Sequence, residues 1–143
     1  MAGLLIEGFA SLYNLEDLSG DVVLPGAFDE TLGSTRPVPM LYQHDPAEPV
    51  GRWHRLSAQG RGLWVEGEVF EDSRAGSPVA SLVRRGAVNG LSIGFRTRQS
   101  CPRRAASRGR FLERVELWEV SIVTFPMLPQ ARLQLADPSR RAA

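Results

Sequence analysis

A serine flanked by small residues is the first candidate for chemistry in this sequence. Ser92 lies in GLSIG, residues 90–94, which fits the G-x-S-x-G pattern around the nucleophile of many serine hydrolases. In α/β-hydrolases that serine ends a strand and opens a helix. Here a predicted helix over 77–86 leads into the strand that carries the serine, and no succession of β-α-β units surrounds it. The pattern therefore does not indicate an α/β-hydrolase.

The surroundings of Ser92 suggest a different reason for its position. Alternate residues of a strand share a face, so Leu91, Ile93 and Phe95 would point into the core while Ser92 lies on the other face between two glycines. The missing side chains leave room for another backbone, which a peptide substrate requires. An exposed serine between two bulge glycines explains the same pattern, and the strand alone favours that simpler interpretation.

A serine nucleophile needs a base, and this sequence offers few. All 17 residues counted as Lys or Arg are arginines, which excludes a lysine base and leaves the two histidines. His44, in MLYQHDPAEPVG, follows an apolar strand and precedes a turn, a place that is rigid yet open to a cleft. His54 lies between Trp53 and Arg55, and we expect a structural role for it. Asp45 beside His44 has no third ligand at a recognisable spacing, so we expect no metal.

The third member of a triad would be a carboxylate that orients the imidazole. Glu119, in the largely apolar stretch VELWEVSIVTF, is expected to be buried, and a buried carboxylate requires a partner. An arginine in a structural ion pair is the simpler partner, and Glu116 is the reserve candidate for the orienting acid. Cys101 lies in an Arg-rich stretch and is disfavoured as a nucleophile. Arg96 or backbone N–H groups could stabilise an oxyanion, and the sequence does not choose between them.

The elements that must position these residues are mostly strands. Alternation and turn residues predict strands over 3–12, 22–24, 37–44, 50–58, 63–70, 88–97 and 110–125, with helices over 27–32 and 77–86. Ser77 would cap the second helix and Gly86 would close it. The polar stretch 98–109 is expected to be a loop. We predict a mainly β (α+β) fold, an antiparallel barrel flanked by short helices, with one domain over 1–136 and a frayed tail over 137–143.

Composition excludes several classes of protein. The formal net charge of +1 on 143 residues provides no field that would steer the chain to nucleic acid. No apolar run is long enough to span a bilayer, and the first residues lack the features of a secretory signal. The single cysteine cannot form an internal disulfide, which agrees with a reducing compartment. We therefore expect a protein of the cytoplasm that binds neither nucleic acid nor membrane.

Six stretches taken together resemble one family. IEGFASLYN, DVVLPGAFDETL, VPMLYQHD with PVGRW, NGLSIGFR and LWEVSIVTFPMLPQA follow one another between residues 6 and 131 as they do in the prohead (head-maturation) proteases of tailed phages and of related prophage or gene-transfer particles. The resemblance implies a serine endopeptidase with a herpesvirus-protease-like fold and no cofactor. It also implies a triad of Ser92, His44 and Glu119, the residues that elimination had singled out.

The resemblance further implies a place of action. The protein would cleave segments of the major capsid protein or scaffold, and itself, inside the assembling procapsid in the cytoplasm of a bacterial host. A non-catalytic capsid-assembly component that keeps the fold is the alternative. Because herpesvirus proteases are activated by dimerisation, we expect weak self-association as well, with the helix over 77–86 as the candidate contact since it leads into the strand of Ser92.

Overall fold

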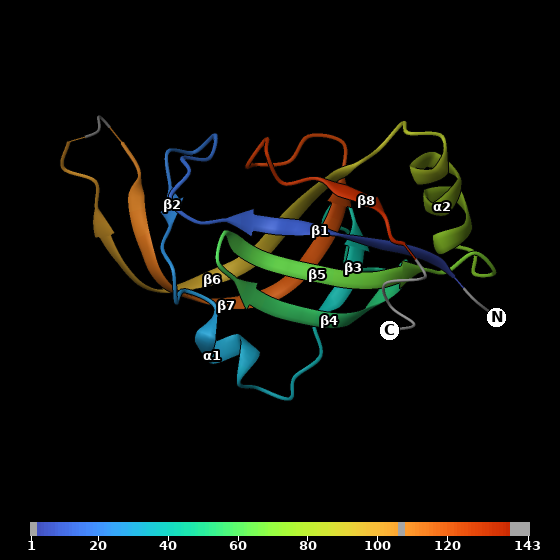
Figure 1. Ribbon diagram of the computed structural model, residues 1–143, viewed down its shortest axis with the longest axis horizontal. Helices are drawn as coiled ribbons and strands as arrows, with labels where there is room; N and C mark the ends of the chain where they lie inside the picture. Colours follow the sequence, from blue (N-terminus) through green and yellow to red (C-terminus); the bar gives the residue numbers. More distant parts are fainter. Residues whose placement is uncertain (1–2, 106–107, 138–143) are drawn as a thin grey trace.

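The computed structural model describes residues 3–105 and 108–137, and Figure 1 shows their arrangement. Eight strands and two short helices are present in this part of the chain, which confirms the predicted mainly β class with two helices. In chain order the elements are β1 (Leu4–Leu12), β2 (Val22–Val23), α1 (Asp29–Leu32), β3 (Pro39–Tyr42), β4 (Gly51–Gln59), β5 (Gly62–Val69), α2 (Gly76–Arg84), β6 (Gly90–Pro102), β7 (Arg110–Val123) and β8 (Leu133–Leu135). The sequence pattern did not predict β8.

All eight strands belong to one curled sheet. Its order is β2-β7-β3-β4-β5-β1-β8, and β6 pairs with the other edge of β7. Among the described residues only an isolated bridge between Gly90 and Arg132 links the start of β6 toward β8, so the sheet curls without closing. The predicted closed barrel is therefore wrong. The sheet is also not purely antiparallel, because β2 and β3 both run parallel to β7.

Strand β7 is the element that brings distant segments together. One of its edges pairs with β6 along almost its whole length, and the other pairs with β2 near its start and with β3 near its end. Pairing with β3 aligns Met40 with Val120 and Tyr42 with Ile122. The end of β3, where the chain turns toward His44, thus lies beside the end of β7.

The β6–β7 hairpin extends beyond the rest of the sheet at the left of Figure 1. Residues 98–102 belong to β6 and not to a loop, so that part of the sequence prediction is wrong. Backbone pairing explains the difference, since Cys101 lies opposite Phe111 and the Arg103 guanidinium stacks 5.7 Å from the centre of the Phe111 ring. Residues 106–107 of the predicted loop lie outside the described residues.

Helix α2 stands at the opposite end of the molecule from that hairpin (Figure 1). It begins one residue earlier than expected, and Ser77 lies inside it. The first N–H group, from Gly76, donates instead to Ser73 Oγ at 2.9 Å. Gly86 closes the helix as predicted, with a φ of +73° and backbone bonds to the last turn. Three apolar residues of the helix are buried: Val79, Ala80 and Val83.

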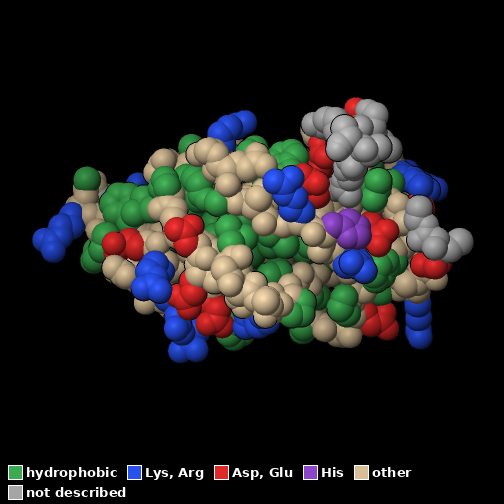
Figure 2. Space-filling model, turned by 60° about the horizontal axis from the view of Figure 1, so that its bottom comes forward, with side chains coloured by type: hydrophobic (Ala, Val, Ile, Leu, Met, Phe, Trp, Pro, Cys, Tyr) green, Lys and Arg blue, Asp and Glu red, His purple; other side chains and the backbone are tan. Residues whose placement is uncertain are grey.

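The concave side of the sheet encloses one apolar core, whose fully buried side chains include Phe28, Met40, Leu91 and Leu117. On the surface, arginines are matched with acids, for example Arg110 with Asp21 at 3.0 Å. Figure 2 shows basic and acidic side chains interspersed over one face, without a continuous basic stripe there. In the part of the chain that the structure describes, no helix is long and apolar enough to cross a membrane. The predicted tail lies outside the described residues except for Asp137.

Candidate active site

Ser92 lies near the start of β6, directly opposite Ser121 of β7. Residues opposite one another in an antiparallel pair share a face, so both hydroxyls lie on the same side of the sheet. Ser92 retains 5% exposure and lines a pocket, whereas Ser121 has none and lines no pocket among those described. A substrate could reach Ser92 and not Ser121.

His44 follows β3 in a tight turn. Gln43 and His44 both have left-handed backbones, with φ of +54° and +60°, and the Asp45 N–H donates to the Tyr42 carbonyl at 3.0 Å. Two successive positive φ angles between these residues are typical of a type I′ turn. Residues with a side chain rarely adopt such angles, and they do so mainly where surrounding contacts hold them. The turn carries the imidazole out from β3 toward β7.

The contacts that hold this turn come from β7 and the residue after it. The Gln43 amide donates to Thr124 Oγ1 at 2.7 Å, and the Thr124 N–H donates back to Gln43 Oε1 at 3.1 Å. The His44 N–H donates to Ser121 Oγ at 3.1 Å. The histidine backbone is therefore anchored on both sides to the end of one strand.

The His44 ring contacts the Glu119 carboxylate. Nδ1 lies 2.5 Å from Glu119 Oε2, while the Ser121 hydroxyl donates to Glu119 Oε1 at 2.6 Å. An ionised carboxylate can only accept, so Nδ1 carries the proton in this bond, and in the neutral imidazole Nε2 then keeps its lone pair. The Glu119 side chain is 12% exposed and that of His44 is 44% exposed. The Glu119 carboxylate is thus shielded from solvent, and the His44 imidazole is accessible.

The glycines on either side of Ser92, Gly90 and Gly94, make room for other parts of the protein. A Cβ added at Gly94 would overlap the Glu119 carboxylate, and one added at Gly90 would lie 2.6 Å from the Val123 carbonyl oxygen and 2.8 Å from Pro126 Cδ. The space at both glycines is filled by the protein itself. The expectation that they make room for a substrate backbone is therefore wrong.

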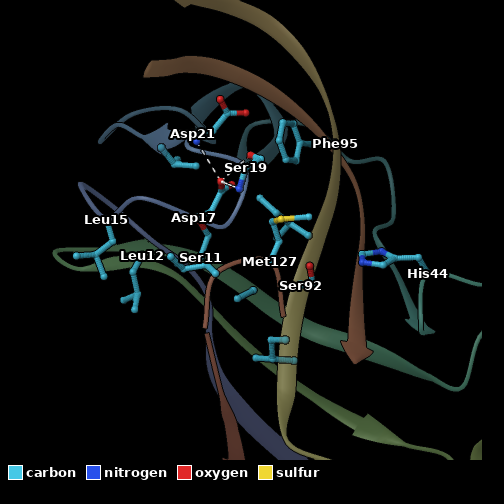
Figure 3. Close-up of a pocket in the computed structure, with 15 residues that line it drawn as sticks. Ser11, Leu12, Leu15, Asp17, Ser19, Asp21, His44, Ser92, Phe95 and Met127 are labelled. Atoms are coloured by element: carbon cyan, nitrogen blue, oxygen red, sulfur yellow. Dashed lines mark hydrogen bonds between the residues drawn. The ribbon is translucent and has the colours of Figure 1, made fainter. Parts of the chain in front are cut away.

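A pocket of about 210 Å³ opens at Ser92 and His44. Its wall is mostly apolar and includes Leu12, Phe95 and Met127, with Asp17 contributed by the chain after β1. Figure 3 shows the His44 ring turned toward the Ser92 hydroxyl, with these side chains on the other side of the serine. No hydrogen bond joins Ser92 and His44 in the described part of the chain. The pocket nevertheless brings Ser92 and His44 to one opening.

Glu116, the reserve candidate for the orienting acid, contacts a tryptophan and arginines instead of the histidine. The indole N–H of Trp118 donates to Glu116 Oε1 at 2.8 Å, and Arg36 and Arg98 lie 3.4 and 3.7 Å away. The Trp118 hydrogen bond, followed by the charges of these arginines, lowers the pKa of Glu116. Arg96, the arginine considered for an oxyanion, is the cross-strand partner of Glu116 and does not line the pocket at Ser92. The geometry joins Glu119, and not Glu116, to the histidine.

The remaining sequence candidates lie elsewhere. His54 Nε2 is 3.8 Å from Glu68 Oε1 on the neighbouring strand, an arrangement that fits a structural role. Cys101 is exposed in the outer part of the β6–β7 hairpin. Between residues 3–105 and 108–137, no group of three or more His, Cys, Asp or Glu side chains is placed to hold a metal ion.

A family model for the Caudovirus prohead serine protease matches residues 2–142. The chain belongs to this family. The prohead protease of Enterobacteria phage HK97 is 35% identical over 130 residues, which cover 89% of this chain and 57% of that protein. The prohead protease of Escherichia phage T5 is 30% identical over 135 residues, 92% of this chain and 62% of that protein. The chain thus spans about three fifths of the length of these two prohead proteases.

The expected herpesvirus-protease-like fold is confirmed by a solved structure. The Kaposi's sarcoma herpesvirus protease, crystallised with a hexapeptide phosphonate inhibitor, superposes with a TM-score of 0.60 over 94% of this chain and 65% of that one. Sequence identity is 19%, so the likeness concerns the fold. This chain and the herpesvirus enzyme therefore share a fold.

Sequence reasoning missed two residues that hold His44 in this chain, Gln43 and Ser121. Gln43 gives no signal in a single sequence, because its left-handed backbone depends on the contacts with Thr124. The sequence showed Ser121 only as sharing a strand face with Glu119. The two-residue spacing of EVS, combined with the parallel pairing of β3 and β7, could have suggested its role. That pairing was not predicted.

Proposed function

We propose that this chain is a serine endopeptidase in which Ser92 is the nucleophile, His44 the base and Glu119 the orienting carboxylate. One observation carries the assignment: the imidazole that bonds Glu119 through Nδ1 opens, with Ser92, onto a single pocket. Membership of a serine protease family supplies the reaction class.

The side chains divide the reaction between them. Ser92 Oγ attacks the scissile carbonyl carbon while His44 Nε2 accepts the serine proton, and the same proton then passes to the leaving amine as the peptide bond breaks. Water repeats the sequence on the acyl-enzyme ester and releases the second product. Glu119 keeps the proton on Nδ1 and stabilises the imidazolium that forms. The bond between Ser92 and His44 forms when substrate closes the pocket, as is common for catalytic hydrogen bonds that are long in a free enzyme.

The substrate follows from the family. The chain belongs to the Caudovirus prohead serine protease family, so we propose segments of the major capsid protein or scaffold as substrates, cleaved within the assembling procapsid in the bacterial cytoplasm. The pocket walls favour an extended segment that places an apolar side chain beside Ser92. No cofactor takes part in this chemistry.

The test is cleavage of the capsid protein encoded beside this chain, read by intact mass. Ser92→Ala removes one oxygen and is expected to abolish cleavage while leaving the melting temperature nearly unchanged. Ser100→Ala, an exposed serine on the same strand, is the matched control and is expected to cleave normally. Normal processing by Ser92→Ala would refute the assignment of the nucleophile. Capsid assembly without cleavage by the wild-type protein would favour the non-catalytic alternative.

A further inference from the structure

We propose that Ser121 is a positioning residue that fixes both the His44 backbone and the Glu119 carboxylate in their productive geometry. The inference rests on the proposed function, because it assigns a second serine to the same site. Ser121 is not a catalytic residue in this proposal: it does not touch the substrate and acts through the histidine and the acid.

The Ser121 hydroxyl is used in both directions. Its O–H donates to Glu119 Oε1 at 2.6 Å, and its oxygen accepts the His44 backbone N–H at 3.1 Å. Glu119 Oε2 then contacts His44 Nδ1 at 2.5 Å, so the three residues form a closed ring of hydrogen bonds. Only a group that donates and accepts at one atom can occupy this place, and among small side chains that is a hydroxyl.

This ring of hydrogen bonds restrains His44, whose imidazole has few other restraints. Its side chain is 44% exposed and its left-handed backbone depends on tertiary contacts, so the local sequence alone does not hold the imidazole in one position. Glu119 alone would constrain the imidazole, but its own side chain could rotate about its single bonds. With Oε1 held by Ser121, the carboxylate keeps one orientation, and Oε2 points at Nδ1. The histidine is thereby fixed at its main chain and at its ring by the same residue.

Burial distinguishes the positioning serine from the nucleophile opposite it. Ser121 is fully buried and outside the pocket, and its proton is committed to Glu119. Ser92 lines the pocket, and its hydroxyl has no hydrogen-bond partner among the described residues. Two serines that face each other across β6 and β7 thus have separate tasks.

The experiment compares Ser121→Ala with Ser121→Thr, which keeps the hydroxyl, and with Ser57→Ala, a strand serine remote from the pocket. Two rates are measured: turnover of a capsid-derived peptide, separated into kcat and KM, and covalent labelling of Ser92 by a fluorophosphonate probe. We expect Ser121→Ala to lower kcat and the labelling rate by about 10- to 100-fold with little change in KM, as for other losses of a group that orients a reacting side chain. Ser121→Thr is expected to recover most of both rates, and Ser57→Ala to match the wild type.

A spectroscopic measurement separates positioning from a general loss of structure. The proton between His44 Nδ1 and Glu119 is expected to give a far-downfield resonance, and Ser121→Ala is expected to broaden or shift it at a temperature where the variant remains folded. If Ser121→Ala does not fold, Ser121→Cys replaces it, since a thiol fills the site but bonds weakly. Wild-type rates and an unchanged resonance in the folded variant would overturn the proposal. An inactive wild-type protein that also resists labelling would instead overturn the proposed function.

Discussion

Gly94 of β6 lies opposite Glu119 of β7, and the acid's carboxylate occupies the space where a side chain on Gly94 would be. An ideal Cβ at Gly94 would be 2.8 Å from Glu119 Cδ. The absence of a side chain at Gly94 thus makes room for the Glu119 carboxylate on the opposite strand, not for a group that approaches Ser92. Its backbone φ is not in the left-handed region, so space alone accounts for the residue.

Gly94→Ala is therefore expected to reduce activity without a large effect on stability. The new methyl would push the Glu119 carboxylate away from His44, and a displacement of about 1 Å at such a site can cost about 100-fold in rate. Peptide turnover and thermal melting measure the two effects. Gly60→Ala is the matched control, because an added Cβ there meets nothing within 4 Å. Equal activity of the two variants would show that the acid tolerates the shift.

Glu119→Gln is expected to lower kcat by orders of magnitude, by analogy with the loss of the orienting acid in other serine proteases, which costs on the order of 10⁴-fold. The amide can present its N–H₂ group to Nδ1 and so favour the wrong tautomer. Glu116→Gln is expected to have little effect on cleavage, because that carboxylate contacts Trp118 and arginines and not His44. The measurement is single-turnover cleavage at saturating enzyme. The opposite ranking of the two variants would transfer the role to Glu116.

The Gln43–Thr124 contact is expected to stabilise the turn that carries His44. Gln43→Ala removes both hydrogen bonds with Thr124, whereas Thr124→Ala keeps the main-chain N–H donor and removes only the bond from the Gln43 amide to Thr124 Oγ1, so the cycle measures that bond. A double-mutant cycle on urea unfolding is expected to give a coupling energy of about 1 kcal/mol. Both single variants are expected to reduce kcat as well. Strictly additive effects would mean that the contact does not hold the turn.

The lowered pKa of Glu116 predicts a pH-dependent contribution to stability. Because the folded-state value lies below the ordinary 4.5, the contribution is fully present above that pH and is lost as the pH falls through the folded pKa. Glu116→Gln removes the contribution. The difference in melting temperature between wild type and variant is therefore expected to be largest near neutral pH and to shrink below about pH 4. If the difference stayed constant down to about pH 2, the Trp118 hydrogen bond and the arginine charges would not be its cause.

Self-association is the expected means of control, with α2 as the contact. The exposed side of this helix carries Ser77, Ser81 and Arg84 while its apolar side is buried, so the contact would be polar and weak. Mass action then makes turnover per enzyme rise with concentration. A dilution series followed by light scattering measures both quantities, and Ser81→Glu is expected to shift the rise to higher concentration. Constant specific activity from a monomer would exclude this control.

The strands were predictable where local patterns decide them. The alternation in LWVEGEVF and the glycine turn before it predicted the β4–β5 hairpin within one or two residues. The outer part of the β6–β7 hairpin was missed, since its polar residues pair only because β7 lies beside them. The same is true of β8, three residues that form a strand only against β1.

The candidate residues follow from elimination and resemblance, but their geometry could not be predicted. Sequence spacing does not show that β3 runs parallel to β7, and this pairing is what brings the His44 turn to Glu119. It likewise does not show a left-handed backbone at Gln43 and His44, which tertiary contacts impose. From the pattern of β6 alone we expected the glycines of GLSIG to make room for a substrate. The atoms that occupy that space belong instead to β7 and to the segment after it.

The parallel pairing of β3 with β7 also sets a time at which the site can exist. His44 and Glu119 are 75 positions apart, and neither β6 nor β7 can join the sheet until the ribosome has released most of the chain. Contacts between such distant segments form late in folding. A nascent chain that has exposed only its histidine segment still lacks both Ser92 and Glu119. Translation itself thus delays assembly of the candidate site until β7 has been made.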